Sequence, residues 1–280
     1  MTRLESDYYS YMDFDPEHTR AVLRHYVPMF EDRSPVLELG CGRGEFLGLL
    51  DAAGIKAQGV DSDEGMVDAA RRVGLDVVCA DAIAFLHGDP APGPYEGVFC
   101  AHFIEHLDPG QVRELLAGVR RVLAPGGRFV AVTPNPACYA VLSHDFWRDP
   151  THVRFYDLPL LEFLCRQAGL EVETTGTNPA NHPGPPPEYL GPEAVVHPPL
   201  GDLVDKATGT LRASLGHHDR KGRASDPHDP EWAFQLAHLV KVLADRLQET
   251  TETLREVRRA HDKLVWGLYQ SNETYVVARG

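Results

Sequence analysis

Short apolar runs alternate with helical patterns from residue 35 to residue 177, and this alternation constrains the fold more than any other feature of the chain. The apolar runs are residues 36–40, 57–61, 76–81, 97–103, 128–134 and 170–177. Apolar strands that are joined by helices form parallel sheets with helices on both faces. The sequence therefore predicts an α/β, doubly wound fold.

The end of the chain also has the composition of a strand. Residues 273–280 ("ETYVVARG") are rich in β-branched and aromatic side chains, and they follow a long helical segment. A strand needs a neighbour that pairs its backbone N–H and C=O groups, and the predicted sheet is the simplest neighbour available. We therefore expect residues 178–272 to form an insertion between the last two strands.

This interpretation divides the chain into five parts. Residues 1–34 form a helical segment, which either packs against the edge of the sheet or covers a ligand as a lid. The other parts follow in chain order: the core at 35–177, a proline- and glycine-rich insertion at 178–230, a long helix at 231–271 and the closing strand at 272–280.

A heptad pattern runs along the predicted long helix. Its positions are spaced alternately by four and three residues: Leu236, Val240, Leu243, Leu247, Thr250, Leu254, Val257, His261, Leu264 and Leu268. Such a stripe is typical of helices that pair in coiled coils. We predict a homo-oligomer, most simply a homodimer, through residues 231–270; the alternative is that the helix packs on its own domain.

Charge and cysteine content argue against several classes of protein. The formal net charge of −14 opposes binding to a phosphate backbone, so nucleic acid is not an expected partner. The five cysteines, at 41, 79, 100, 138 and 165, show neither disulfide-type nor metal-type spacing, which favours a reducing compartment. We find no signal-peptide pattern and no apolar run of about 18 residues, so we expect no membrane span and a cytoplasmic location.

A glycine-rich turn, "VLELGCGRGEF", follows the first predicted strand and opens a helix. Its glycines permit a tight turn and close approach of a ligand to the helix N-terminus; they are Gly40, Gly42 and Gly44. Glu38 precedes them, while Asp61 and Asp81 end the second and third strands. Acids at successive strand ends, with no basic residue for phosphate, favour a positively charged nucleoside ligand.

This constellation resembles the class I S-adenosylmethionine-dependent methyltransferases over roughly residues 30 to 177. The resemblance implies S-adenosyl-L-methionine as cofactor, with the glycine loop under its methionine portion, Asp61 at the ribose and Asp81 at the adenine. It also implies a Rossmann-like, seven-stranded sheet with an antiparallel strand beside the fifth. Residues 275–279 ("YVVAR") are similar to that closing strand.

Two further stretches, "FIEHL" (103–107) and "FWRDPTHVR" (146–154), resemble a narrower branch of this superfamily. That branch contains ubiquinone-pathway O-methyltransferases, small-RNA 2′-O-methyltransferases and enzymes associated with bacterial glycan or natural-product sugars, and the second stretch is most similar to the last group. We therefore expect an O-methyltransferase that acts on a sugar or glycan hydroxyl. The alternatives are a small-molecule enzyme of secondary-metabolite or quinone type and a non-catalytic coiled-coil scaffold.

Histidines near the predicted strand ends are candidates for the chemistry. A general base assists when a hydroxyl loses its proton, and we predict His152 as this base, with His106 as the second candidate. The alternative is that His152 only bonds its own loop. Residues at i, i+3 and i+4 share a helix face, and four side chains are therefore candidate ligands of zinc, iron or manganese: His102, Glu105, His106 and His152. The alternative is that Glu105 and His106 cap a helix and orient His152 without a metal.

Overall fold

A computed structural model describes residues 11–12, 15–182, 184–185, 209 and 230–280. The chain divides into two compact units, one of residues 1–184 with 268–280 and one of residues 185–267. Most of the predicted segment 178–230 lies outside the described residues. Its first residues, from 178 to 182, are described and belong to the first unit.

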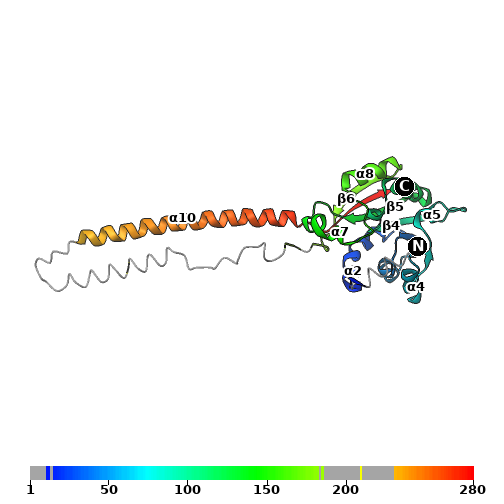
Figure 1. Cartoon of the computed structure of the whole chain (residues 1–280), viewed down its shortest axis with the longest axis horizontal. Helices are drawn as coiled ribbons and strands as arrows, with labels where there is room; N and C mark the ends of the chain where they lie inside the picture. The colour runs from blue at the N-terminus through cyan, green and yellow to red at the C-terminus, as the bar shows by residue number, and fades with distance from the viewer. Residues whose placement is uncertain (1–10, 13–14, 183, 186–208, 210–229) are drawn as a thin grey trace, which may run out of the picture. The chain divides into compact units, whose positions relative to one another are not determined.

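The first unit is built on one mixed sheet whose strands have the order β3-β2-β1-β4-β5-β7-β6. The strands are β1 Val36–Leu39, β2 Ala57–Asp61, β3 Val77–Cys79, β4 Tyr95–Ala101, β5 Leu123–Pro134, β6 Glu171–Thr177 and β7 Glu273–Arg279. The first five are parallel, whereas β7 runs antiparallel between β5 and β6 (red in Figure 1). The predicted seven-stranded α/β fold, with an insertion before its closing strand, is confirmed.

Helices cover both faces of this sheet. The helical elements of the first unit are α2 Pro16–Leu23, η1 Arg24–Phe30, α3 Glu45–Ala52, α4 Glu64–Arg72, α5 Ala82–Leu86, η2 Ile104–His106, α6 Pro109–Val122, η3 Val141–Asp145, α7 Phe146–Arg148 and α8 Leu158–Gln167. Helix α10, Pro230–Leu268, belongs almost entirely to the second unit. Several helices begin where an aspartate accepts hydrogen bonds from the first-turn N–H groups, as Asp108 does for α6 and Asp157 for α8. Proline follows both caps, at a position where no N–H is needed.

Two apolar cores hold these layers together. On one face of the sheet, buried residues of α5, α6 and α8 pack against strand residues such as Val98 and Phe129. On the other face, η1 and α3 contribute aromatic rings, and the ring centroids of Phe46 and Phe99 lie 4.0 Å apart. Because the parallel strands share one direction, their carboxyl ends and the loops that follow meet at one edge.

Helix α10 carries the predicted heptad stripe. Its described apolar positions are exposed by 36 to 66%: Val240, Leu243, Leu247, Leu254, Val257, Leu264 and Leu268. The side chain of Leu236 lies outside the described residues. Self-association through this stripe stays a prediction. Among the described residues, no helix combines the length and apolar content that crossing a bilayer requires.

Candidate functional site

The glycine-rich turn between β1 and α3 lines a cavity at the carboxyl edge of the sheet. Its three glycines have positive φ angles of 69°, 52° and 83° at positions 40, 42 and 44, a region that other residues rarely adopt. A Cβ atom on Gly40 would lie 2.6 Å from Phe103 Cδ2, whereas a Cβ on Gly42 would meet no described atom within 4 Å. Close packing thus fixes Gly40, and the open space beside Gly42 admits a ligand.

Asp61, at the end of β2, holds this turn in place. Its Oδ2 accepts a hydrogen bond of 2.8 Å from the Gly42 N–H, and its Oδ1 accepts one of 2.9 Å from the Asp63 N–H. Burial raises the pKa of Asp61, and these backbone donors oppose the rise. Asp81 lines the same cavity and accepts a hydrogen bond of 2.8 Å from Ala84, which caps α5. The structure therefore brings both strand-end acids to the glycine turn.

Glu38 lies buried on β1 beside the turn and also lines the cavity. Its Oε2 has no hydrogen-bond partner among the described residues. Burial, followed by repulsion from Glu45 and Asp61, raises the pKa of Glu38 well above its usual value. The nearby Arg43 is paired with Glu45 at 2.9 Å. A buried carboxyl oxygen without a partner is costly, and a ligand that donates hydrogen bonds or carries positive charge would relieve that cost.

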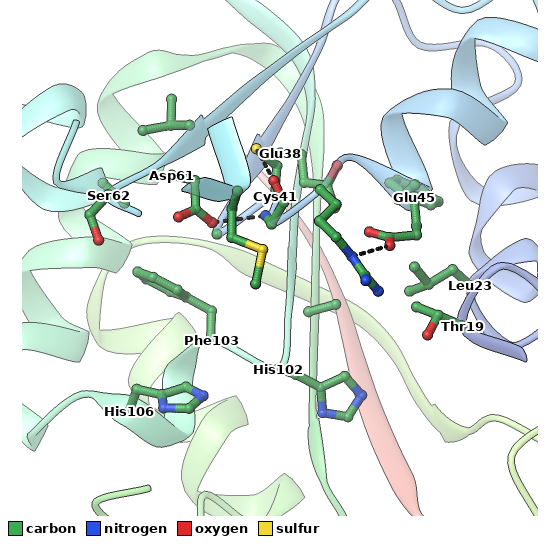
Figure 2. Close-up of a pocket in the computed structure, with 18 of the residues that line it drawn as sticks. Thr19, Leu23, Glu38, Cys41, Glu45, Asp61, Ser62, His102, Phe103 and His106 are labelled. Atoms are coloured by element: carbon green, nitrogen blue, oxygen red, sulfur yellow. Dashed lines mark hydrogen bonds and ion pairs between the residues drawn. The ribbon is translucent and has the colours of Figure 1, made fainter. Parts of the chain in front are cut away.

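Histidines form the opposite wall of the cavity, below Asp61 and Glu38 in Figure 2. His102 follows β4 with a φ of 50°, and its ring lies between two carboxylates, 2.9 Å from Glu273 Oε2 and 3.3 Å from Glu105 Oε1. Burial would lower the pKa of His102, but the two carboxylates outweigh burial and raise it to about 10. His102 is therefore a cation at neutral pH, with both ring nitrogens protonated.

Hydrogen bonds fix the tautomer of His106. The Thr151 hydroxyl lies 2.5 Å from Asp149 Oδ1 and 2.8 Å from His106 Nδ1. Because a carboxylate has no hydrogen to donate, the Thr151 hydroxyl donates to Asp149 and accepts from His106. The Nε2 atom of His106 then keeps its lone pair, and burial lowers the pKa of this residue. His106 is a neutral imidazole that lines the cavity.

His152 lies beside His106, with 4.7 Å between the ring centroids. Its Nδ1 donates to the carbonyl oxygen of Phe146 at 2.6 Å, which places the lone pair of the neutral tautomer on Nε2. Potential ligand atoms of Glu105, His106 and His152 all lie within 4.8 Å of one another. Three of the four predicted metal ligands thus come together.

His102 does not fit the predicted set of four ligands. That prediction assumed one helical face, but η2 spans only Ile104–His106, and His102 precedes it in the left-handed region. Its ring is ion-paired with two carboxylates instead. The group whose potential ligand atoms lie close enough together for one ion comprises Glu105, His106 and His152.

A second cavity adjoins the first at His102 and was not predicted from the sequence. Apolar side chains of Pro134, Val141 and Phe146 line it, together with His152. Two amides also belong to its wall; they are Asn181, near the start of the insertion, and Asn272, at its end. These residues are distant in sequence and carry no motif. The predicted return of the last strand to the sheet was the one signal that could have placed Asn272 here.

Comparisons with known proteins agree with this geometry. A family model described as a methyltransferase domain matches residues 13–175. The bifunctional biotin biosynthesis protein BioHC of Cellvibrio japonicus is 30% identical over 55% of this chain, which spans only 32% of that protein. A ubiquinone biosynthesis O-methyltransferase of Thiobacillus denitrificans is 29% identical over 58% of this chain and 76% of its own. A solved structure of a SAM-dependent methyltransferase from Archaeoglobus fulgidus has the same fold, with a TM-score of 0.63, 24% identity and 97% coverage of both chains.

Proposed function

The chain belongs to the family of methyltransferase domains, and we propose that it methylates a hydroxyl group of a small-molecule acceptor with S-adenosylmethionine. The observation that carries this proposal is the pairing of two walls across one cavity. Unsatisfied and strand-end acids lie on one side, and the neutral imidazole of His106 lies on the other. The first wall suits a cationic nucleoside, and the second suits proton removal from an acceptor.

The donors and acceptors of the first wall fit this cofactor. Glu38 offers an unpaired carboxyl oxygen to positively charged groups, and the open side of Gly42 leaves room for close approach. Asp61 and Asp81 each retain lone pairs beyond their backbone contacts, which ribose hydroxyls and an adenine amine would fill. When bound, the cofactor supplies an electrophilic methyl group on a sulfonium.

His106 is the proposed general base, and it replaces His152 as the first candidate. The sulfonium methyl would lie in the first cavity, so the acceptor hydroxyl has to enter that cavity to react. Of the two histidines, His106 lines this cavity and His152 does not. The Thr151 hydroxyl accepts the hydrogen bond from His106 Nδ1 and donates to Asp149 Oδ1, and these two contacts orient the His106 ring. The hydrogen bonds through Thr151 to Asp149 would also stabilise the imidazolium that forms when His106 takes the acceptor proton.

The second cavity is the proposed acceptor site. Its apolar side chains favour a molecule with an apolar part, and Asp145 and Arg148 add charged groups to the same lining. Val141 and Phe146 provide apolar surface next to His152. A phenolic hydroxyl has an ordinary pKa of about 10, so one histidine can assist its ionisation more readily than that of a sugar hydroxyl. Curated relatives named for ubiquinone and menaquinone biosynthesis support this quinone-type acceptor over the predicted glycan.

A divalent ion at Glu105, His106 and His152 is a second proposal for the same wall. One carboxylate and two imidazoles are a donor set that suits zinc, iron or manganese. Such an ion would polarise the acceptor hydroxyl, and His106 would then act as ligand and not as base. Full activity after chelation would retain His106 as base; loss that one metal restores would assign the cluster to that metal.

Two measurements test the proposed function. Isothermal titration with S-adenosylmethionine should show binding to the purified protein. Transfer of a labelled methyl group should then occur to 3,4-dihydroxybenzoate, a phenolic probe, and not to a methyl glycoside. Binding without transfer to any hydroxyl acceptor would refute the activity, and preference for the glycoside would restore the sugar assignment. No binding would refute the proposal as a whole.

We further propose that the protein forms a homodimer through α10. The exposed apolar side chains of α10 keep heptad spacing along the helix. Pairing with the same helix of a second copy would bury these side chains. Solvent exposure of such a stripe is unfavourable, at about 25 cal/mol for each Å² of apolar surface.

A further inference from the structure

The carboxylate of Glu273, the first residue of β7, accepts four hydrogen bonds in a buried position. Its Oε1 accepts from the Tyr26 hydroxyl at 2.6 Å and from Asn178 Nδ2 at 2.7 Å. Its Oε2 accepts from His102 Nε2 at 2.9 Å and from Asn181 Nδ2 at 2.9 Å. Burial opposes ionisation, but His102 and the other donors hold the pKa of Glu273 at about 2. A carboxylate is the one side chain that can accept from four donors at once.

The two oxygen atoms of this carboxylate face different surroundings. Tyr26 and Asn178, which contact Oε1, are fully buried and line neither cavity. His102 and Asn181, which contact Oε2, both line the second cavity. Oε1 therefore anchors Glu273 in the interior, and Oε2 holds part of the cavity wall.

The backbone of His102 shows why this wall needs to be held. His102 has a φ of 50°, and it is the one residue other than glycine with a positive φ in the described part of the chain. That conformation is strained for a side chain with a Cβ, and it persists only where neighbouring contacts enforce it. The charge-assisted contacts of His102 with Glu273 and Glu105 provide this restraint.

The same region ties the two ends of the insertion together. The Asn272 N–H donates to the Asn181 carbonyl at 2.8 Å, and the Ser271 hydroxyl donates to the Asn178 carbonyl at 2.6 Å. Residues at both ends of the insertion thus lie next to Glu273. The wall that His102 and Asn181 form is therefore held by Glu273 of β7, which contacts His102 after β4 and Asn181 near the start of the insertion.

We propose that Glu273 is a positioning residue for the acceptor, because its Oε2 fixes His102, which lines both cavities, and Asn181, which lines the second. This inference rests on the proposed function of the second cavity. The groups that fit the cofactor, on β1, β2 and the glycine turn, make no hydrogen bond to Glu273. Loss of Glu273 Oε2 should therefore weaken acceptor binding and leave cofactor binding in place.

Glu273→Gln is the first test, because it keeps the shape and replaces one accepting oxygen with a donating amide. We expect the KM for 3,4-dihydroxybenzoate to rise at least about tenfold, while the Kd for S-adenosylmethionine changes less than about threefold. A crystal structure of the variant gives a readout that needs no acceptor. His102 should leave the left-handed region or Asn181 should move, and unchanged positions of both would overturn the inference.

Two further variants separate positioning from stability. Asn181→Ala removes a donor to Oε2, and it should raise the acceptor KM as Glu273→Gln does. Tyr26→Phe removes a donor to Oε1; it should lower the melting temperature and leave the acceptor KM unchanged. Equal rises in KM for Tyr26→Phe and Asn181→Ala would overturn the inference. A wild-type protein that binds no S-adenosylmethionine would instead refute the proposed function, and the crystal structure would still decide whether Glu273 holds the wall.

Discussion

Replacing Asp61 with asparagine should weaken both the glycine turn and cofactor binding. The Asp61 carboxylate accepts hydrogen bonds of 2.8 and 2.9 Å from two backbone N–H groups, one on each oxygen. Asparagine can accept one of them, and its amide nitrogen would face the other N–H group. A hydrogen bond to a charged group contributes about 1.5–3 kcal/mol, so the free energy of unfolding should fall by about 2–3 kcal/mol. Urea denaturation measures this change.

The same substitution should raise the Kd for S-adenosylmethionine at least about tenfold, which corresponds to about 1.4 kcal/mol. Asp63 provides a matched control, since it is also buried and accepts hydrogen bonds from two backbone N–H groups but does not line the cavity. Asp63→Ala should cost about 1 kcal/mol of stability through loss of a helix cap and leave the Kd unchanged. Calorimetry that finds wild-type affinity in Asp61→Asn, or equal loss in both variants, would refute the reasoning.

Three other predictions follow from the described contacts. His106→Asn should lower kcat by about 10²–10⁴ with unchanged cofactor Kd, and single-turnover kinetics that match the wild type would reject it as the base. Glutamate at both Leu247 and Leu254 should give monomers by light scattering; an unchanged mass would show that the stripe packs within its own chain. The pKa of Glu273 falls from 4.5 to about 2 on folding, so its stabilisation is present above pH 4.5 and is lost as the pH falls towards 2. This contribution to the free energy of unfolding is about 3 kcal/mol, and it should be absent from Glu273→Gln when urea denaturation is measured across the pH range. The same loss of stability in acid for the wild type and the variant would contradict the prediction.

Local patterns were sufficient to predict the sheet and one wall of the site. The apolar strands and the glycine turn encode their own backbone geometry, and parallel topology brings Asp61 and Asp81 to the same edge as Gly42. The composition of residues 273–280 indicated a strand, and the need to pair its backbone placed that strand in the sheet. These inferences needed no knowledge of side-chain contacts.

The opposite wall could not be predicted because it depends on contacts between distant residues. Glu273 and His102 are 171 positions apart, and no periodicity relates them. The i, i+3, i+4 spacing of the histidine stretch suggested one helical face, but the turn there begins only at Ile104. Tertiary contacts with two carboxylates instead determine the conformation and charge of His102.

The raised pKa of Glu38 leads to a last prediction, on the pH dependence of cofactor binding. Burial and the neighbouring acids raise the pKa of Glu38, which favours its neutral form in the ligand-free protein. A cationic ligand favours the ionised form, and its binding must therefore release a proton from Glu38. The affinity for S-adenosylmethionine should rise as the pH rises through this pKa, because less work is then needed to ionise the residue.

S-adenosylhomocysteine lacks the sulfonium charge, so its Kd should depend less on pH. Calorimetry of both ligands between pH 6 and about 8.5, in buffers of different ionisation enthalpy, measures the affinity and the proton release together. Glu38→Gln cannot ionise and should remove the difference between the two ligands, while Asp63→Ala should preserve it. Titration of His106 would change the Kd of both ligands in the same way. If the pH dependence of Kd still differs between the two ligands in Glu38→Gln, Glu38 does not sense the charge of the cofactor.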